Sequence, residues 1–122
     1  MPVITETRTI TTPNATMIAL ATPSLGSREL STWRVHMQPG ATGPVHTIDR
    51  EQIWVPLDGT FEMTINGETR TLVPGQAAIV PAGATRQVST GAVPAEALVS
   101  MPIGGMAHAR GAEALVPLPW AE

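Results

Sequence analysis

The chain has 122 residues and no cysteine, a length that suits one domain with a single hydrophobic core. It carries 7 basic and 10 acidic residues, a net charge of −3, so its composition offers no positive surface for nucleic acid or for an anionic membrane. The lack of cysteine excludes disulfides and thiolate metal sites, and no apolar run approaches the roughly 20 residues that a membrane helix needs.

Residues 1–27 are predicted to contribute N-terminal strands. Residues 3–12 are rich in threonine and nearly alternate, which favours a strand that pairs with another subunit. Residues 17–21 form a short apolar piece between turns and indicate a weak strand. The beginning of the chain contains acidic residues and lacks the basic and apolar regions of a signal peptide, so we expect a cytoplasmic protein.

Apolar and polar side chains alternate over residues 29–38, which predicts a strand with one buried face. Its apolar side consists of Trp33, Val35 and Met37, and its polar side of Arg34, His36 and Gln38. Proline and glycine break the chain at residues 39–40 and again at 43–44, so that His46 begins the next strand.

The strongest turn signals of the sequence follow. The apolar run 53–57 ends at Asp58-Gly59, which predicts a tight hairpin into the alternating run 60–65. Asn66-Gly67 predicts a second hairpin, which residues 68–72 complete.

The rest of the chain continues in short pieces. Strands are expected at residues 77–80, 86–90 and 95–101, and the tail from residue 104 is expected to be a loop and an extended ending with Trp120 docked on the barrel. No segment has the pattern of a helix of three turns. Many short strands with Gly and Pro turns between them predict an all-β sandwich or barrel.

Two segments framed by glycine and proline, residues 40–59 and 75–90, have a paired spacing. The positions that set their turns are Gly40, Gly59, Gly75, Pro81 and Gly83. This spacing resembles the two signature motifs of the cupin family, and the resemblance extends from residue 28 or so to the end of the chain. It implies a double-stranded β-helix, or jelly-roll barrel, over residues 28–122. It also implies a homodimer, in which residues 1–27 supply strands exchanged with the partner.

The resemblance further implies a divalent metal held by two histidines and a glutamate from the first motif and a third histidine from the second. His46 stands at the first histidine and Gln52 at the glutamate. Ile48 occupies the second histidine position and Arg86 the third. The set is degenerate, because isoleucine cannot coordinate and a guanidinium is a permanent cation without a lone pair.

Strand alternation predicts which side chains share the cavity. If His46 points inward, Gln52 does so too, and Arg86 faces them from another strand. The apolar walls of the substrate site are predicted to be Trp54, Met63, Ile48, Phe61, Met37 and Val88. A polar cluster in an apolar cup is typical of a small-molecule site.

These residues favour acid–base chemistry without an obligatory metal. We assign His46 to proton transfer, Arg86 to stabilising an anion or oxyanion through its planar fork of donors, and Gln52 to positioning. Because a lone buried charge is costly, we expect Arg86 to pair with an acid or with an anionic ligand. The predicted function is conversion of a small, partly apolar metabolite by an isomerase, lyase, dehydratase or cyclase reaction.

Other interpretations remain open from the sequence. A metal-dependent oxidoreductase or lyase would bind Zn, Fe, Mn or Ni through His46, Gln52 and Glu51, if a bulge turned Glu51 inward. A non-catalytic small-molecule-binding barrel needs no reactive group at all. His46 would then be structural, and Arg86 would lie at the barrel mouth beside Glu51 or Asp49.

The two remaining histidines are not predicted as ligands. His36 lies on the face opposite Trp33, which favours the surface or an interface. His108 lies in a Gly/Ala-rich stretch that is expected to be a mobile loop.

Overall fold

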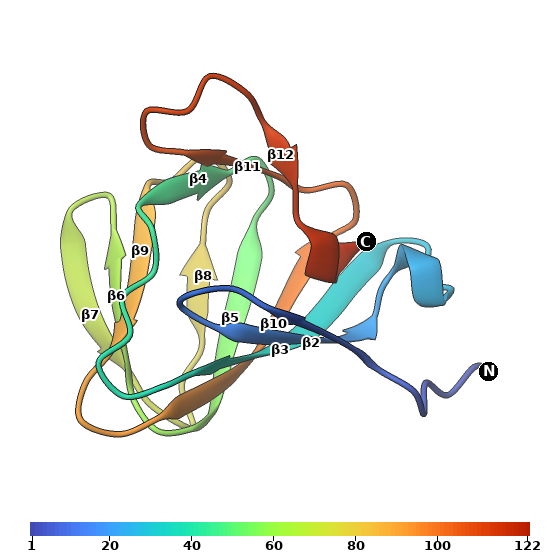
Figure 1. Cartoon of the computed structure of the whole chain (residues 1–122), viewed down its shortest axis with the longest axis horizontal. Helices are drawn as coiled ribbons and strands as arrows, with labels where there is room; N and C mark the ends of the chain where they lie inside the picture. The colour runs from blue at the N-terminus through green and yellow to red at the C-terminus, as the bar shows by residue number, and fades with distance from the viewer.

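A computed structural model describes all 122 residues as two six-stranded antiparallel sheets facing each other (Figure 1). The first sheet contains β1 (Arg8–Thr11), β2 (Thr16–Ala21), β3 (Leu30–Met37), β5 (Gln52–Asp58), β8 (Ala78–Val80) and β10 (Ala95–Pro102). The second contains β4 (His46–Ile48), β6 (Phe61–Ile65), β7 (Glu68–Leu72), β9 (Arg86–Thr90), β11 (Met106–Ala109) and β12 (Val116–Pro117). Their orders are β1-β2-β3-β10-β5-β8 and β12-β11-β4-β9-β6-β7. The all-β prediction is confirmed.

The helical segments are two 3-10 turns of three residues each, η1 (Pro23–Leu25) and η2 (Pro119–Ala121). The expected absence of any three-turn helix is therefore correct. No helix in the structure has the length and apolar character required to cross a membrane.

The hydrophobic core lies between the two sheets, where inward-facing side chains of both interdigitate. In β3, Trp33, Val35 and Met37 are buried, while the residues between them are half-exposed. The predicted two-residue period of burial is therefore confirmed. β3 lies inside its sheet, paired with β2 on one side and β10 on the other.

The Asn66-Gly67 hairpin is confirmed. Asn66 and Gly67 have φ values of 49° and 83°, the left-handed pair that a type I′ turn requires, and they join β6 to β7 in perfect register from Ile65↔Glu68 to Phe61↔Leu72.

The prediction of a hairpin at Asp58-Gly59 is wrong. β5 pairs with β10 and β8, whereas β6 pairs with β7 and β9, so this turn carries the chain from one sheet to the other. Gly59 has a φ of 69°, and the carboxylate of the preceding Asp58 accepts the Gly59 N–H at 3.0 Å. The dipeptide specifies a local reversal, but the edges available for pairing decide whether the two strands become neighbours.

The two ends of the chain also differ from expectation. Only residues 8–11 of the predicted N-terminal strand are extended as β1, which pairs with β2 of the same chain. The tail is not a simple loop, because β11 pairs with β4 and β12 pairs with β11 before η2 packs against the first sheet. Exchange of strands in a homodimer stays a prediction.

Gly59→Ala tests the sheet-crossing turn. A Cβ at this position would meet the Pro94 carbonyl and Ala95, and the positive φ adds strain. We expect the free energy of unfolding to fall by about 2 kcal/mol or more, measured by urea denaturation. Gly91→Ala is the control, since its φ is not positive and nothing lies within 4 Å of its Cβ. Equal losses in the two variants would contradict this account of Gly59.

Candidate functional site

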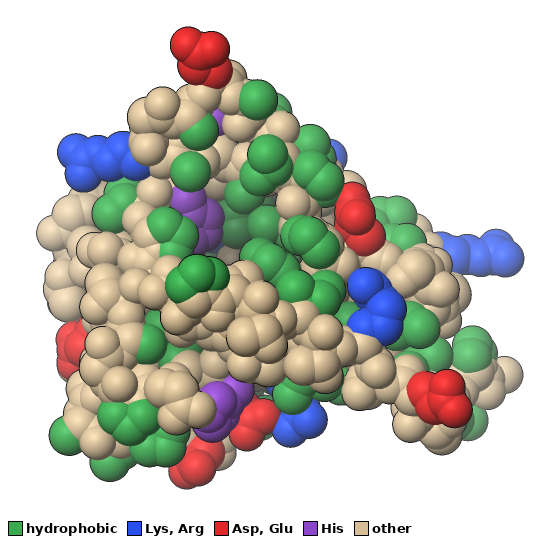
Figure 2. Space-filling model, viewed as in Figure 1, with side chains coloured by type: hydrophobic (Ala, Val, Ile, Leu, Met, Phe, Trp, Pro, Cys, Tyr) green, Lys and Arg blue, Asp and Glu red, His purple; other side chains and the backbone are tan.

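A cavity of about 530 Å³ opens between the two sheets and is lined by 23 residues. Its walls come from inward-facing residues of both sheets, and its rim comes from the β1–β2 turn and the C-terminal segment 116–120. Figure 2 shows apolar side chains gathered in the hollow, with histidine atoms at its edge. The polar side chains on its inner wall include His46, Gln52 and Arg86.

Arg86 is buried on the inner face of β9, with 2% of its surface exposed. The turn after β8 wraps its guanidinium: Nε and Nη2 donate to the Ala84 carbonyl at 3.3 and 3.2 Å, and Nη2 also donates to the Pro81 carbonyl at 3.2 Å. The Gly83 N–H of that turn donates to the Ile48 carbonyl at 2.8 Å, which ties the second motif to the first.

Of the two partners expected for Arg86, an acid of this chain is not found, and an anionic group of a ligand stays a prediction. None of the ion pairs in the structure includes it, and burial lowers its pKa to about 10. It therefore remains a cation at neutral pH. Four of its donor contacts are made to Ala84, Pro81 and Gln52, which leaves one Nη1 N–H of the five without a protein acceptor.

Gln52 holds the centre of the polar cluster. It is 2% exposed, and its Oε1 accepts the Arg86 Nη1–H at 3.3 Å and the Trp54 Nε1–H at 3.1 Å. Its Nε2 faces the Met101 sulfur at 3.6 Å. Two donors aimed at Oε1 fix the orientation of the amide, since a flipped amide would point its own N–H groups at them.

His46 begins β4 and lies beside Arg86, its register partner on β9. Its Nδ1 is 2.9 Å from the Pro44 carbonyl, which can only accept, so Nδ1 carries the proton. Burial lowers the pKa of His46 below 6.5, the Pro44 hydrogen bond partly opposes this, and the charge of Arg86 lowers it further. The imidazole is thus neutral near pH 7, with an Nε2 lone pair that has no protein donor.

The donors present do not fit a divalent metal. His46 offers one nitrogen, the Gln52 oxygen already accepts two hydrogen bonds, and the Arg86 cation stands beside both. No cluster of three His, Cys, Asp or Glu side chains occurs anywhere in the structure. A metal would have to displace the cation and break the Gln52 network.

The alternative donor Glu51 is not turned inward. It is exposed just before β5 and does not line the cavity. Asp49 lies on the surface near Arg50 and accepts the Met106 N–H at 2.8 Å, so neither acid approaches Arg86. The interpretation of Arg86 as a surface residue at the barrel mouth is wrong as well, given its burial.

Four of the six predicted wall residues line the cavity: Ile48, Trp54, Met37 and Val88. Phe61 and Met63 do not. Phe61 is fully buried with its ring 5.8 Å from that of Trp54 in an edge-to-face contact, and Met63 borders a separate hollow beside β7 and β8. Strand alternation correctly predicted that both side chains point inward, but it does not predict where along the barrel they lie.

The other histidines do not join the site. His36 faces away from the cavity, as expected. His108 lies in β11 rather than in a loop, opposite Thr47, and the cavity-lining neighbours Ala107 and Ala109 place it on the outer face.

Sequence reasoning placed Trp120 on the barrel, but it did not predict that Trp33 and the C-terminal segment line the cavity. Trp33 lines the cavity, and the inward side of its strand was the signal that could have identified it. Leu118 and Trp120 also line the cavity, and the tail is held by the Ser31 hydroxyl, which donates to the Ala121 carbonyl at 2.6 Å.

Comparisons with known proteins agree with this architecture. The family profile described as "Cupin domain" matches residues 33–101. The polyketide cyclase RemF from Streptomyces resistomycificus is 22% identical, with a TM-score of 0.73, over 84% of this chain and 79% of that chain. No curated protein sequence matches significantly.

Two further solved structures have the same fold. The DMSP lyase DddQ from Ruegeria pomeroyi DSS-3 is 26% identical with a TM-score of 0.68, over 89% of this chain but only 53% of the lyase. A sugar phosphate isomerase from a cupin superfamily, from Silicibacter pomeroyi DSS-3, is 20% identical with a TM-score of 0.66, over 81% of this chain and 68% of that chain. The predicted jelly-roll barrel is confirmed.

Nuclear magnetic resonance of the free protein tests the state of His46. We expect ¹⁵N shifts typical of a neutral ring protonated at Nδ1, and a pKa below 6.5. In Arg86→Gln the pKa of His46 should rise, because one of the two effects that lower it is removed. An Nε2-protonated ring, or a pKa above 6.5 in the unmodified protein, would contradict the assignment.

Gln52→Leu tests the buried network. The substitution leaves the Trp54 N–H and one Arg86 N–H without their acceptor in a closed environment. We expect a loss of about 2–4 kcal/mol in the free energy of unfolding, measured with denaturant. Gln38→Leu serves as the control, because that side chain is exposed and makes no hydrogen bond. A loss below about 0.5 kcal/mol at Gln52 would show that the network is not stabilising.

Proposed function

The chain belongs to the cupin family, and on that premise we propose that its barrel binds a small, largely apolar carbonyl compound and transfers a proton on it. One observation carries the proposal. The free lone pair of a neutral His46 and the single free N–H of the Arg86 cation lie on neighbouring strands in an otherwise apolar cavity. A base beside an oxyanion donor is the arrangement that forms an enolate.

The composition of the cavity supports an apolar substrate. Its walls include three tryptophans, Trp33, Trp54 and Trp120, and no carboxylate or lysine. A sugar with hydroxyls on every carbon would leave most of them without a partner there, which is costly in a site shielded from water. A flat ring system with few oxygens matches both the volume and the lining.

In the proposed step, His46 Nε2 removes a proton from the carbon next to the substrate carbonyl. The electrons of that C–H bond form a carbon–carbon double bond, and the carbonyl electrons move to the oxygen, which accepts the free Arg86 Nη1–H. The enolate forms without any oxidant. Nε and Nη2 are held by Ala84 and Pro81, so Arg86 offers one N–H rather than the two-pronged fork that a carboxylate prefers.

The fate of the enolate decides the reaction class. Reprotonation at another carbon gives isomerisation, loss of a β-substituent gives elimination, and attack on a second carbonyl closes a ring. The cyclase and the lyase of similar fold support this range, and the apolar lining favours the cyclase type. We propose that no resident metal takes part, on the strength of the donor set at Gln52 and Arg86.

Proton–deuterium exchange tests this proposal without knowledge of the natural substrate. β-Tetralone is a bicyclic apolar ketone whose C–H between ring and carbonyl is acidic. We expect the protein to accelerate loss of that proton signal in D₂O, and His46→Gln to lower the rate by about 10²–10⁴-fold. The rate should rise with pH through the lowered pKa of His46 and level off above that pKa, because the neutral ring is the base.

Two controls separate the alternatives. Chelation, or addition of zinc, iron, manganese or nickel, should leave the exchange rate unchanged, and dependence on one of these metals would sink the metal-free mechanism. His36→Gln should also have no effect, since His36 faces away from the cavity. Binding of β-tetralone without any His46-dependent exchange would identify a binding barrel instead of an enzyme.

A further inference from the structure

We propose that Trp33 donates a second hydrogen bond to the substrate, from the wall opposite His46 and Arg86, so that the cavity selects molecules with two separated acceptor oxygens. The inference rests on the proposed function, because it concerns the same cavity and the same ligand. It adds a specificity determinant that the enolate step does not need.

The indole N–H of Trp33 has no partner in the protein. Trp33 is only 3% exposed and lines the cavity. The side-chain atoms that are both occluded and unpartnered are Arg8 Nε, Arg8 Nη2 and Ser27 Oγ, so Nε1 of Trp33 is not sealed off. Because Trp33 lines the cavity and little of the residue is exposed anywhere, we infer that Nε1 faces the cavity.

Trp54 is the natural comparison for the unpartnered N–H of Trp33. It is also buried and lines the same cavity, yet its N–H is consumed by the Gln52 amide oxygen at 3.1 Å. Buried indole N–H groups normally find an acceptor, and Trp33 has none within the fold. The missing acceptor is therefore expected to arrive with the ligand.

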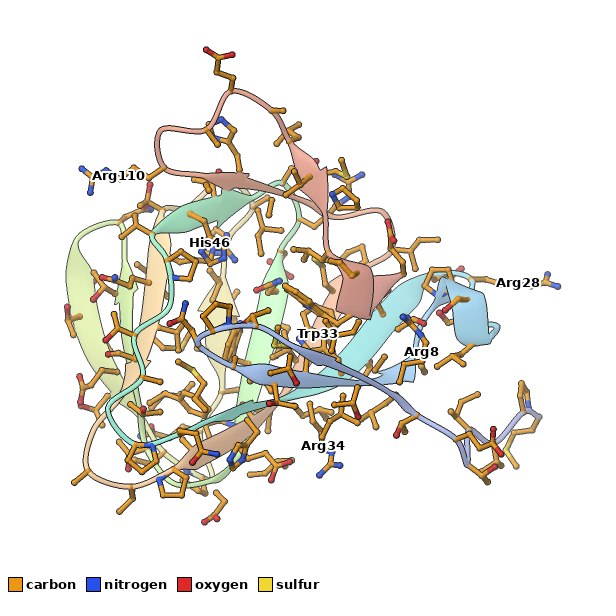
Figure 3. All side chains as sticks on the ribbon, viewed as in Figure 1. Arg8, Arg28, Trp33, Arg34, His46 and Arg110 are labelled. Carbon is orange, nitrogen blue, oxygen red and sulfur yellow. The ribbon has the colours of Figure 1, made fainter.

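The position of Trp33 sets the shape of that ligand. Trp33 projects from β3 in the first sheet, whereas His46 and Arg86 project from β4 and β9 in the second. Figure 3 shows the labelled His46 and Trp33 coming from these opposite sheets. The cavity of about 530 Å³ between the two sheets has room for a bicyclic or tricyclic ring system. A carbonyl at Arg86 and an ether, carbonyl or phenol oxygen at Trp33 would satisfy both walls.

A matched pair of ligands isolates this contact. The probes are two β-tetralones substituted on the aromatic ring at the end far from the ketone, one with methoxy and one with the nearly isosteric ethyl group. We expect the natural protein to bind the methoxy compound about three- to tenfold more tightly in a fluorescence titration, the effect of one neutral hydrogen bond. In Trp33→Phe the ratio of the two affinities should fall to about one.

Trp54→Phe is the control, because it removes the same N–H from a ring whose donor is already used. It should change the two affinities equally and keep their ratio. Equal affinities in the natural protein, or a preference that survives Trp33→Phe, would overturn the inference. Exchange of unsubstituted β-tetralone, which has no second oxygen, reports on His46 alone, so failure of the proposed function would be seen separately.

Discussion

The buried cation at Arg86 is the constraint on which the site depends. Burial lowers the pKa of Arg86 to about 10, so the fold must offset the cost of desolvating this cation without a carboxylate. It does so with the carbonyls of Ala84 and Pro81 and the amide oxygen of Gln52. The turn between β8 and β9 therefore has to wrap the guanidinium. The Gly83 N–H of this turn donates to the Ile48 carbonyl, which fixes the turn to β4.

The same cation determines the chemistry of its neighbours. Its charge helps to keep the His46 imidazole neutral, so a group that would otherwise be partly protonated near pH 6.5 is ready to accept a proton. It also occupies the Gln52 oxygen together with Trp54, which removes that oxygen as a metal ligand. Where the family pattern implies a metal site, this barrel therefore contains the Arg86 guanidinium and the neutral His46 imidazole.

The apolar cup around this pair controls how strongly they act. Trp33 and Trp54 line its walls, and the C-terminal turn brings Trp120 to its rim. In apolar surroundings a hydrogen bond is stronger than in water because less solvent competes for it, so this lining would strengthen the proposed Arg86 contact to an enolate oxygen. The C-terminal turn and the polar residues His46 and Arg86 therefore line one cavity, although they come from distant parts of the chain.

The sequence alone determined the strand periodicity and the Asn66-Gly67 hairpin, because each is a property of residues close together in the chain. The resemblance to cupins put Ile48 and Arg86 at two positions where the family pattern has histidines. Only the tertiary structure decided that Asp58-Gly59 crosses between sheets, that Phe61 does not line the cavity, and that Arg86 is held by carbonyls rather than by an acid. Periodicity reports which face a side chain takes. Its depth, its partner and its cover depend on segments far away in the chain, which meet only when the barrel closes.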